Sequence, residues 1–154
     1  MKRISRLTIT LLLSAGMDLL LPSTLRAATC TVTANPIAFG NYNPLAAAPS
    51  NRTGRITAVC NGKGTLTVAL NTGLSGTYDP RVMISGTTSD ELDYNLYTTA
   101  ARVTIFGDGT AGTQTVSKNF KSNTVRIRVY GQIPAMENIA PGNYSDSITA
   151  TIIF

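Results

Sequence analysis

The chain has 154 residues, of which 43% are hydrophobic and only 14% are charged, and it contains no histidine and no tryptophan. A chain of this length has room for one domain with its own core, which argues against two domains. The formal net charge is +5, but residues 1–27 hold four basic residues against one acidic residue, and residues 28–154 hold nine against seven. Because this larger part is close to neutral, it lacks the basic footprint of a nucleic-acid-binding protein.

Residues 1–28 have the pattern of a secretory signal peptide. A basic start precedes an apolar stretch from Leu7 to Leu21, and small residues close the segment. A membrane anchor is the alternative, but the apolar stretch is 15 residues long and includes Asp18, whereas a spanning helix needs about 20 apolar residues. We therefore expect cleavage of residues 1–28, an exported protein, and a mature domain that comprises residues 29–154.

Cys30 and Cys60 are the only cysteines, and both follow the export signal. An even number of cysteines in an oxidising compartment predicts a disulfide. A zinc site or a catalytic thiol is the alternative, but the chain has no histidine to complete either one. We expect a Cys30–Cys60 disulfide and no metal.

The residues between the two cysteines and after the second one alternate between apolar and polar types. Residues 34–44 place Ile37 and Phe39 among turn residues, which predicts a short edge strand followed by a loop over 45–53. Two alternating stretches within residues 55–70 flank a glycine-containing turn, which predicts a β-hairpin.

Five further strands are expected before the last one. They lie at residues 81–85, 92–97, 103–106, 113–117 and 124–130, with a turn over 118–123. Within the last of these, Arg126 and Arg128 are interpreted as solvent-facing residues opposite an apolar face. No segment has the periodicity of an amphipathic helix.

Two polar clusters between these strands invite chemical interpretations. Asp90, Glu91 and Asp93 offer carboxylates for acid–base chemistry or calcium, but their spacing fits no EF-hand loop, and a solvated turn is the better interpretation. The Gly107–Gly112 segment resembles a phosphate-binding loop, but no Gly-Lys-Ser/Thr sequence follows it. We expect a turn there, and no enzyme activity.

The last eleven residues, 144–154, predict a half-buried strand whose two faces differ in polarity. Its apolar face carries Ile148, Ala150, Ile152 and Phe154. Because no later strand follows, we expect one edge of this strand to stay unpaired or to be completed by another chain. About seven or eight short strands with two cysteines in an exported domain predict an all-β, immunoglobulin-like sandwich.

Several short stretches, taken together in order, resemble the spore coat protein U domain family, which includes the pilins of archaic (Csu-type) chaperone–usher pili. The stretches are Cys30-Thr-Val, Phe39-Gly-Asn-Tyr-Asn-Pro44, Gly54-x-Ile-Thr-x-x-Cys60, Leu92-x-Tyr-Asn-Leu-Tyr97, Ala101-Arg102, Phe106-Gly-Asp-Gly-Thr110, Val129-Tyr-Gly-Gln-Ile-Pro134 and Gly142-Asn-Tyr-Ser-Asp146. The resemblance covers residues 30–154.

The resemblance implies an incomplete immunoglobulin-like β-sandwich that lacks its final strand. A periplasmic chaperone would supply that strand first, and a neighbouring pilin subunit would replace it after passage through an outer-membrane usher. The donor-strand groove would then be lined partly by Ile148, Ala150, Ile152 and Phe154. No small-molecule cofactor is implied.

The chain departs from a polymerising pilin in one respect. Only two residues, Ala28 and Thr29, separate the expected cleavage region from Cys30, whereas a donor segment needs on the order of ten residues. This predicts a subunit that accepts a strand but gives none, and that sits at the fibre tip or stays unpolymerised. The alternative function is a self-standing secreted adhesive or binding β-domain, which would be monomeric without a chaperone.

Overall fold

The computed structural model describes residues 28–154, so the predicted signal peptide lies outside the described residues apart from Ala28. The described chain forms nine strands and one short 3-10 helix, η1 (Gly73–Ser75). The strands are β1 (Thr29–Asn35), β2 (Ser50–Asn61), β3 (Lys63–Leu70), β4 (Arg81–Ser85), β5 (Glu91–Tyr97), β6 (Val116–Lys121), β7 (Thr124–Ile133), β8 (Tyr144–Ser145) and β9 (Ala150–Ile153). No helix in residues 28–154 is long and apolar enough to cross a membrane.

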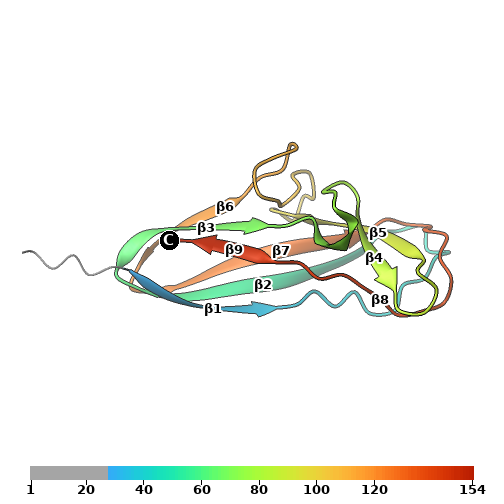
Figure 1. Ribbon diagram of the computed structural model, residues 1–154, viewed down its shortest axis with the longest axis horizontal. Helices are drawn as coiled ribbons and strands as arrows, with labels where there is room; N and C mark the ends of the chain where they lie inside the picture. The colour runs from blue at the N-terminus through green and yellow to red at the C-terminus, as the bar shows by residue number, and fades with distance from the viewer. Residues whose placement is uncertain (1–27) are drawn as a thin grey trace, which may run out of the picture.

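The strands form two antiparallel sheets, which confirms the all-β sandwich (Figure 1). The larger sheet has the order β1-β2-β7-β5-β4-β8, and the smaller one has the order β6-β3-β9. β2 and β7 show why the layers form: their alternate residues Ile56, Ile127 and Val129 are buried, while Arg126 and Arg128 between them are exposed, as predicted. The apolar alternation of the sequence is thus buried between the sheets.

The predicted hairpin over residues 55–70 is wrong. β2 pairs with β1 and β7, whereas β3 pairs with β6 and β9, so the chain changes sheets at Gly62. Two backbone bonds hold this crossing against the β6–β7 turn: Cys60 N–H donates to Asn123 O, and Ser122 N–H donates to Gly62 O. Alternation fixes which face a strand buries, but it does not fix which strand lies beside it.

Several predicted boundaries also change. β1 ends at Asn35, residues 36–49 form no strand, and Ser50 to Thr53 belong to β2 rather than to a loop. The expected strand at 103–106 is reduced to the isolated bridges Tyr97–Ile105 and Phe106–Gln114. Most of the turn expected at 118–123 is strand β6.

The acidic cluster is another correction, because Glu91 and Asp93 lie in strand β5 rather than in a turn. Within residues 28–154, no three histidine, cysteine, aspartate or glutamate residues gather to hold a metal ion. The Gly107–Gly112 segment lies outside the strands, and it contains positive φ angles at Gly109 and Gly112.

Candidate functional site

A long groove of about 930 Å³ opens along one side of the sandwich. Its rims include Ala34 and Asn35 of β1, the irregular segment 36–44, and residues 144–150 that lead into β9. β1 and β9 are edge strands of the larger and the smaller sheet, and each has a hydrogen-bonded neighbour on one side only. Figure 1 shows β1 below β9 on the same side of the molecule. The groove therefore reaches one end of each of these two edge strands.

The floor of the groove consists of side chains from the hydrophobic core. The buried residues that line it are Phe39, Ile56, Leu70, Met83, Leu92, Tyr94, Leu96, Val129 and Ile133. These residues come from both sheets and the segment before β2, so the opening reaches the centre of the sandwich. Such a continuous apolar opening is the kind of surface that a partner covers.

The segment 36–44 forms one wall because two glycines let it approach the larger sheet closely. A Cβ atom at Gly54 would lie 2.6 Å from Ile37 Cγ1, and one at Gly131 would lie 2.8 Å from Phe39 Cζ. Phe39 also packs edge-on against Tyr94, with 6.1 Å between ring centroids. Ile37 and Phe39 were expected in a strand, but they lie in a loop and pack against the hydrophobic core from there.

The opposite wall has a polar anchor at Asp146. Its Oδ2 accepts a 2.5 Å hydrogen bond from Tyr94 Oη, and its Oδ1 accepts from the N–H groups of Leu74 (2.8 Å) and Ser147 (2.6 Å). Burial, followed by the hydrogen bond to Asp146, raises the pKa of Tyr94 well above its ordinary value. One sequence feature could have indicated this contact, namely a tyrosine on the buried face of β5. A buried tyrosine hydroxyl needs a hydrogen-bond partner, but the sequence does not say which residue provides it.

Asn71 continues this anchor toward β9. Its Oδ1 accepts a hydrogen bond from Thr149 N–H at 2.9 Å, and its own N–H donates to Thr149 O at 3.1 Å. Between β8 and β9, the backbone N–H groups of Ser147 and Thr149 thus donate to the side chains of Asp146 and Asn71 instead of to a neighbouring strand. The terminal strand predicted over 144–154 is therefore broken into β8 and β9.

A fully buried arginine, Arg81, lies beside this anchor, and sequence reasoning did not find it. Arg81 donates to Asn71 O from Nε and Nη2, to Phe106 O from Nη2 at 2.7 Å, and to Asn95 Oδ1 from Nη1 at 2.9 Å. Its guanidinium carbon also lies 5.1 Å from the centre of the Tyr78 ring. Burial lowers the pKa of Arg81. Its contacts tie the loops at this end of the sandwich together.

The structure separates the four residues that were predicted to line the groove. Ile148 and Ala150 lie among the lining residues. Ile152 is half-buried against the core but is not among them, and Phe154, beyond the end of β9, is 51% exposed. Ala150 and Ile152 face inward because they pair with the buried residues Leu70 and Val68.

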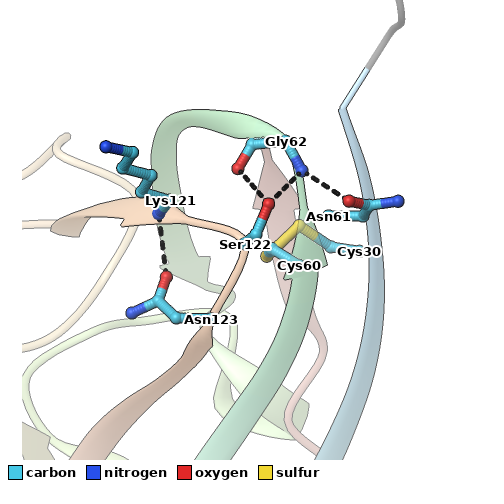
Figure 2. Close-up of a disulfide and its surroundings, with 7 residues drawn as sticks. All are labelled: Cys30, Cys60, Asn61, Gly62, Lys121, Ser122 and Asn123. Carbon is cyan, nitrogen blue, oxygen red and sulfur yellow. Dashed lines mark hydrogen bonds between the residues drawn. A yellow bond between two sulfur atoms is a disulfide. The ribbon is translucent and has the colours of Figure 1, made fainter.

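The predicted disulfide is present and joins β1 to β2. Cys30 and Cys60 are direct partners in the antiparallel register, with an S–S distance of 2.10 Å. Figure 2 shows the bridge beside the sheet-crossing turn, where Gly62 N–H donates to Asn61 Oδ1 and to Ser122 Oγ. The bond therefore fastens the edge strand β1 close to one end of the sandwich.

Comparison with known proteins assigns the chain to a protein family. The profile of the Spore Coat Protein U domain matches residues 18–151, and the chain belongs to this family. It is 28% identical over 127 residues to "Protein U" of Myxococcus xanthus, a match that covers 75% of this chain and 70% of that protein.

A solved structure shares the fold. It is the CsuC–CsuE chaperone–tip adhesion subunit pre-assembly complex from the archaic chaperone–usher Csu pili of Acinetobacter baumannii. The TM-score is 0.61 at 22% identity, and the match covers 83% of this chain but only 40% of that chain. At this identity the likeness establishes a pilin-like, immunoglobulin-type fold.

Proposed function

We propose that this protein is an exported structural subunit of a chaperone–usher surface pilus or a related surface coat, and that it is not an enzyme. The observation that carries the proposal is the groove: core side chains form its floor, and Ala34 and Asn35 of the edge strand β1 and Ala150 of the edge strand β9 border it. A strand inserted there would add backbone hydrogen bonds at the edges and place alternate side chains over the core. This step is donor-strand complementation.

The proposed partners follow from that step. A periplasmic chaperone fills the groove during export, an outer-membrane usher passes the subunit on, and a neighbouring subunit provides the final strand at the cell surface. The similar Csu complex, which pairs a chaperone with a tip subunit, supports this order of partners. The tip position of this subunit stays a prediction that N-terminal sequencing of the exported protein tests.

Two neighbouring residues of β9 give a matched test. Ala150 faces the groove, and Thr151 is exposed on the other face of the same strand. Ala150→Asp places a charge where the inserted strand would bury it, at a cost of several kcal/mol, whereas Thr151→Asp adds the same charge in water. We expect Ala150→Asp to abolish co-purification with the periplasmic chaperone and Thr151→Asp to retain it.

Because Ala150→Asp can also impair folding, the same preparations are assayed for the Cys30–Cys60 disulfide by thiol alkylation. A variant that has formed the disulfide and has lost the chaperone supports the proposal. Equal co-purification of the two variants contradicts it, as does wild-type protein that is monomeric and fully stable with no chaperone bound. That second result is the one expected for a self-standing adhesive domain.

A further inference from the structure

The outward face of β2 and β7 carries three arginines in close register. Arg55 of β2 lies directly opposite Arg128 of β7, and Arg126 lies opposite Thr57. All three arginines are exposed. Like charges directly opposite one another destabilise a sheet. The protein thus maintains a repulsion that uncharged polar residues would avoid.

No acidic residue in the same part of the sheet offsets this charge. The sequences of β1, β2 and β7 contain no aspartate and no glutamate. Asp79 does reach the sheet, where its Oδ1 accepts a hydrogen bond from Asn95, the partner of Gln132. Gln132 is four residues from Arg128, or about 13 Å along a strand, which exceeds the screening length of about 8 Å in physiological salt.

The residues around the arginines are hydroxyls, amides and aromatic rings. Asn35 pairs with Arg55, and Thr53 pairs with Tyr130, which in turn pairs with Tyr97. A hollow of about 260 Å³ opens between Asn35, Thr53, Arg55 and Arg128. Guanidinium groups bind carboxylates and sulfates through paired N–H donors, and hydroxyls and amides match the donors and acceptors of sugar hydroxyls.

We propose that this face binds an acidic polysaccharide whose sugars carry carboxylate or sulfate groups. Directly opposed residues on antiparallel strands have Cα atoms about 5 Å apart, and alternate residues of one strand lie about 7 Å apart. The three guanidinium groups can therefore meet anionic groups on successive sugars. Nucleic acid fits less well, because its binding draws on many phosphate contacts from basic side chains and this face offers three arginines.

This inference does not depend on strand exchange, although Asn35 and Arg55 also border the groove. The test variant for this reason alters Arg126 and Arg128, neither of which lines it. The matched control is Lys63→Gln/Lys121→Gln, which removes two exposed charges from a directly opposed pair in the smaller sheet. Arg126→Gln/Arg128→Gln removes the same charge from the proposed face.

Binding of the full exported chain is measured by surface plasmon resonance on immobilised polygalacturonate and on dextran sulfate, with methyl-esterified polygalacturonate and dextran as uncharged counterparts. We expect wild-type protein to bind at least one of the two charged polymers and neither uncharged one. Arg126→Gln/Arg128→Gln is expected to bind about tenfold more weakly or worse, and the lysine control is expected to stay within about twofold of wild type. The charged polymer that binds identifies the anionic group.

The arginine variant is also expected to retain chaperone binding and to melt no lower than wild type, since it removes a repulsion. Equal losses in the two double variants would overturn the proposal. So would wild-type binding to neither charged polymer, or equally tight binding to double-stranded DNA, which would mark a face without selectivity for glycans.

Discussion

Asp146 is the residue on which the shape of the groove wall depends most. Its carboxylate accepts three hydrogen bonds, one from the buried Tyr94 side chain and two from the backbone of Leu74 and Ser147. These contacts join β5, the η1 turn and the segment before β9. Because hydrogen bonds to charged groups are stronger than neutral ones, Asp146 fixes where the wall turns toward the free edge of β9.

Removing one hydroxyl tests this role. Tyr94→Phe keeps the buried ring but takes one donor from Asp146, and we expect it to lower the free energy of unfolding by about 1.5–3 kcal/mol. Tyr97→Phe is the control, since the Tyr97 side chain is half-buried and its hydroxyl takes part in none of the hydrogen bonds of residues 28–154. Urea unfolding measures both variants, and equal losses would refute the importance of the Tyr94–Asp146 bond.

The same tyrosine gives a pH dependence with a definite sign. In the unfolded chain, tyrosine loses its proton near pH 10, whereas burial and Asp146 raise the pKa of Tyr94 in the folded protein. The protonated Tyr94 side chain therefore contributes fully to the free energy of unfolding below about pH 10. This contribution is lost as the pH rises further, because tyrosine releases its proton first in the unfolded chain. The pKa of Tyr97 is also raised by burial, so other tyrosines add to the trend.

The contribution of Tyr94 is isolated by comparison with Tyr94→Phe. Between about pH 9 and about pH 11, we expect wild type to lose more stability than the variant does. Urea unfolding across this range, at constant ionic strength, makes the measurement. Parallel curves for the two proteins would show that Tyr94 ionises as freely in the folded state as in the unfolded chain.

At the scale of the elements, β1 is an edge strand that is held to the sandwich through a single neighbour. It pairs with β2 alone, and the Cys30–Cys60 disulfide supplies the covalent link between the two. β1 also forms one rim of the groove. The disulfide thus holds the edge strand β1 against β2 beside the groove.

We expect Cys30→Ser/Cys60→Ser to destabilise the fold by about 3–4 kcal/mol, the value for a closed loop of this length, and to lower the yield of exported protein. Chemical unfolding and the amount recovered from the periplasm measure the effect. Two free thiols in exported wild-type protein, detected by alkylation and mass spectrometry, would contradict this role.

The elements also show where sequence reasoning succeeds. Alternation located β2, β3, β5 and β7 and assigned Arg126 and Arg128 to the solvent, because burial of one face depends on local order alone. It failed for the 55–70 hairpin, where the partners of β2 and β3 come from distant parts of the chain. It also missed the break between β8 and β9, because Asp146 and Asn71 bind neighbouring backbone through contacts formed only in the folded molecule.

For the candidate site, the sequence predicted the disulfide and the inward direction of Ile148, Ala150 and Ile152, but it also placed Phe154 on that face, and Phe154 is exposed. It did not predict the second rim, because Ile37 and Phe39 line it from a loop whose close approach depends on Gly54 and Gly131. Arg81 was equally hidden, since its partners are two backbone carbonyls and one amide from separate segments. Sites assembled by such long-range contacts leave no local pattern.

At the scale of the whole molecule, the sandwich formed by residues 28–154 has an open seam. The larger sheet ends at β1, the smaller sheet ends at β9, and core side chains are accessible between them. One additional strand in this seam would pair with an edge and cover the apolar floor. Under the proposed strand addition, the protein reaches its final stability only when another chain fills this seam.

Amide hydrogen exchange tests this dependence most directly, with the full chain compared before and after its incorporation into surface fibres. We predict that amides of Ala150–Ile153 not bonded to β3 exchange rapidly in the dissociated chain and at least about 100-fold more slowly in the fibre. β3 and β7, which are already paired on both sides, should change far less. Unchanged exchange along β9, with protection appearing elsewhere on the surface, would contradict assembly by strand addition.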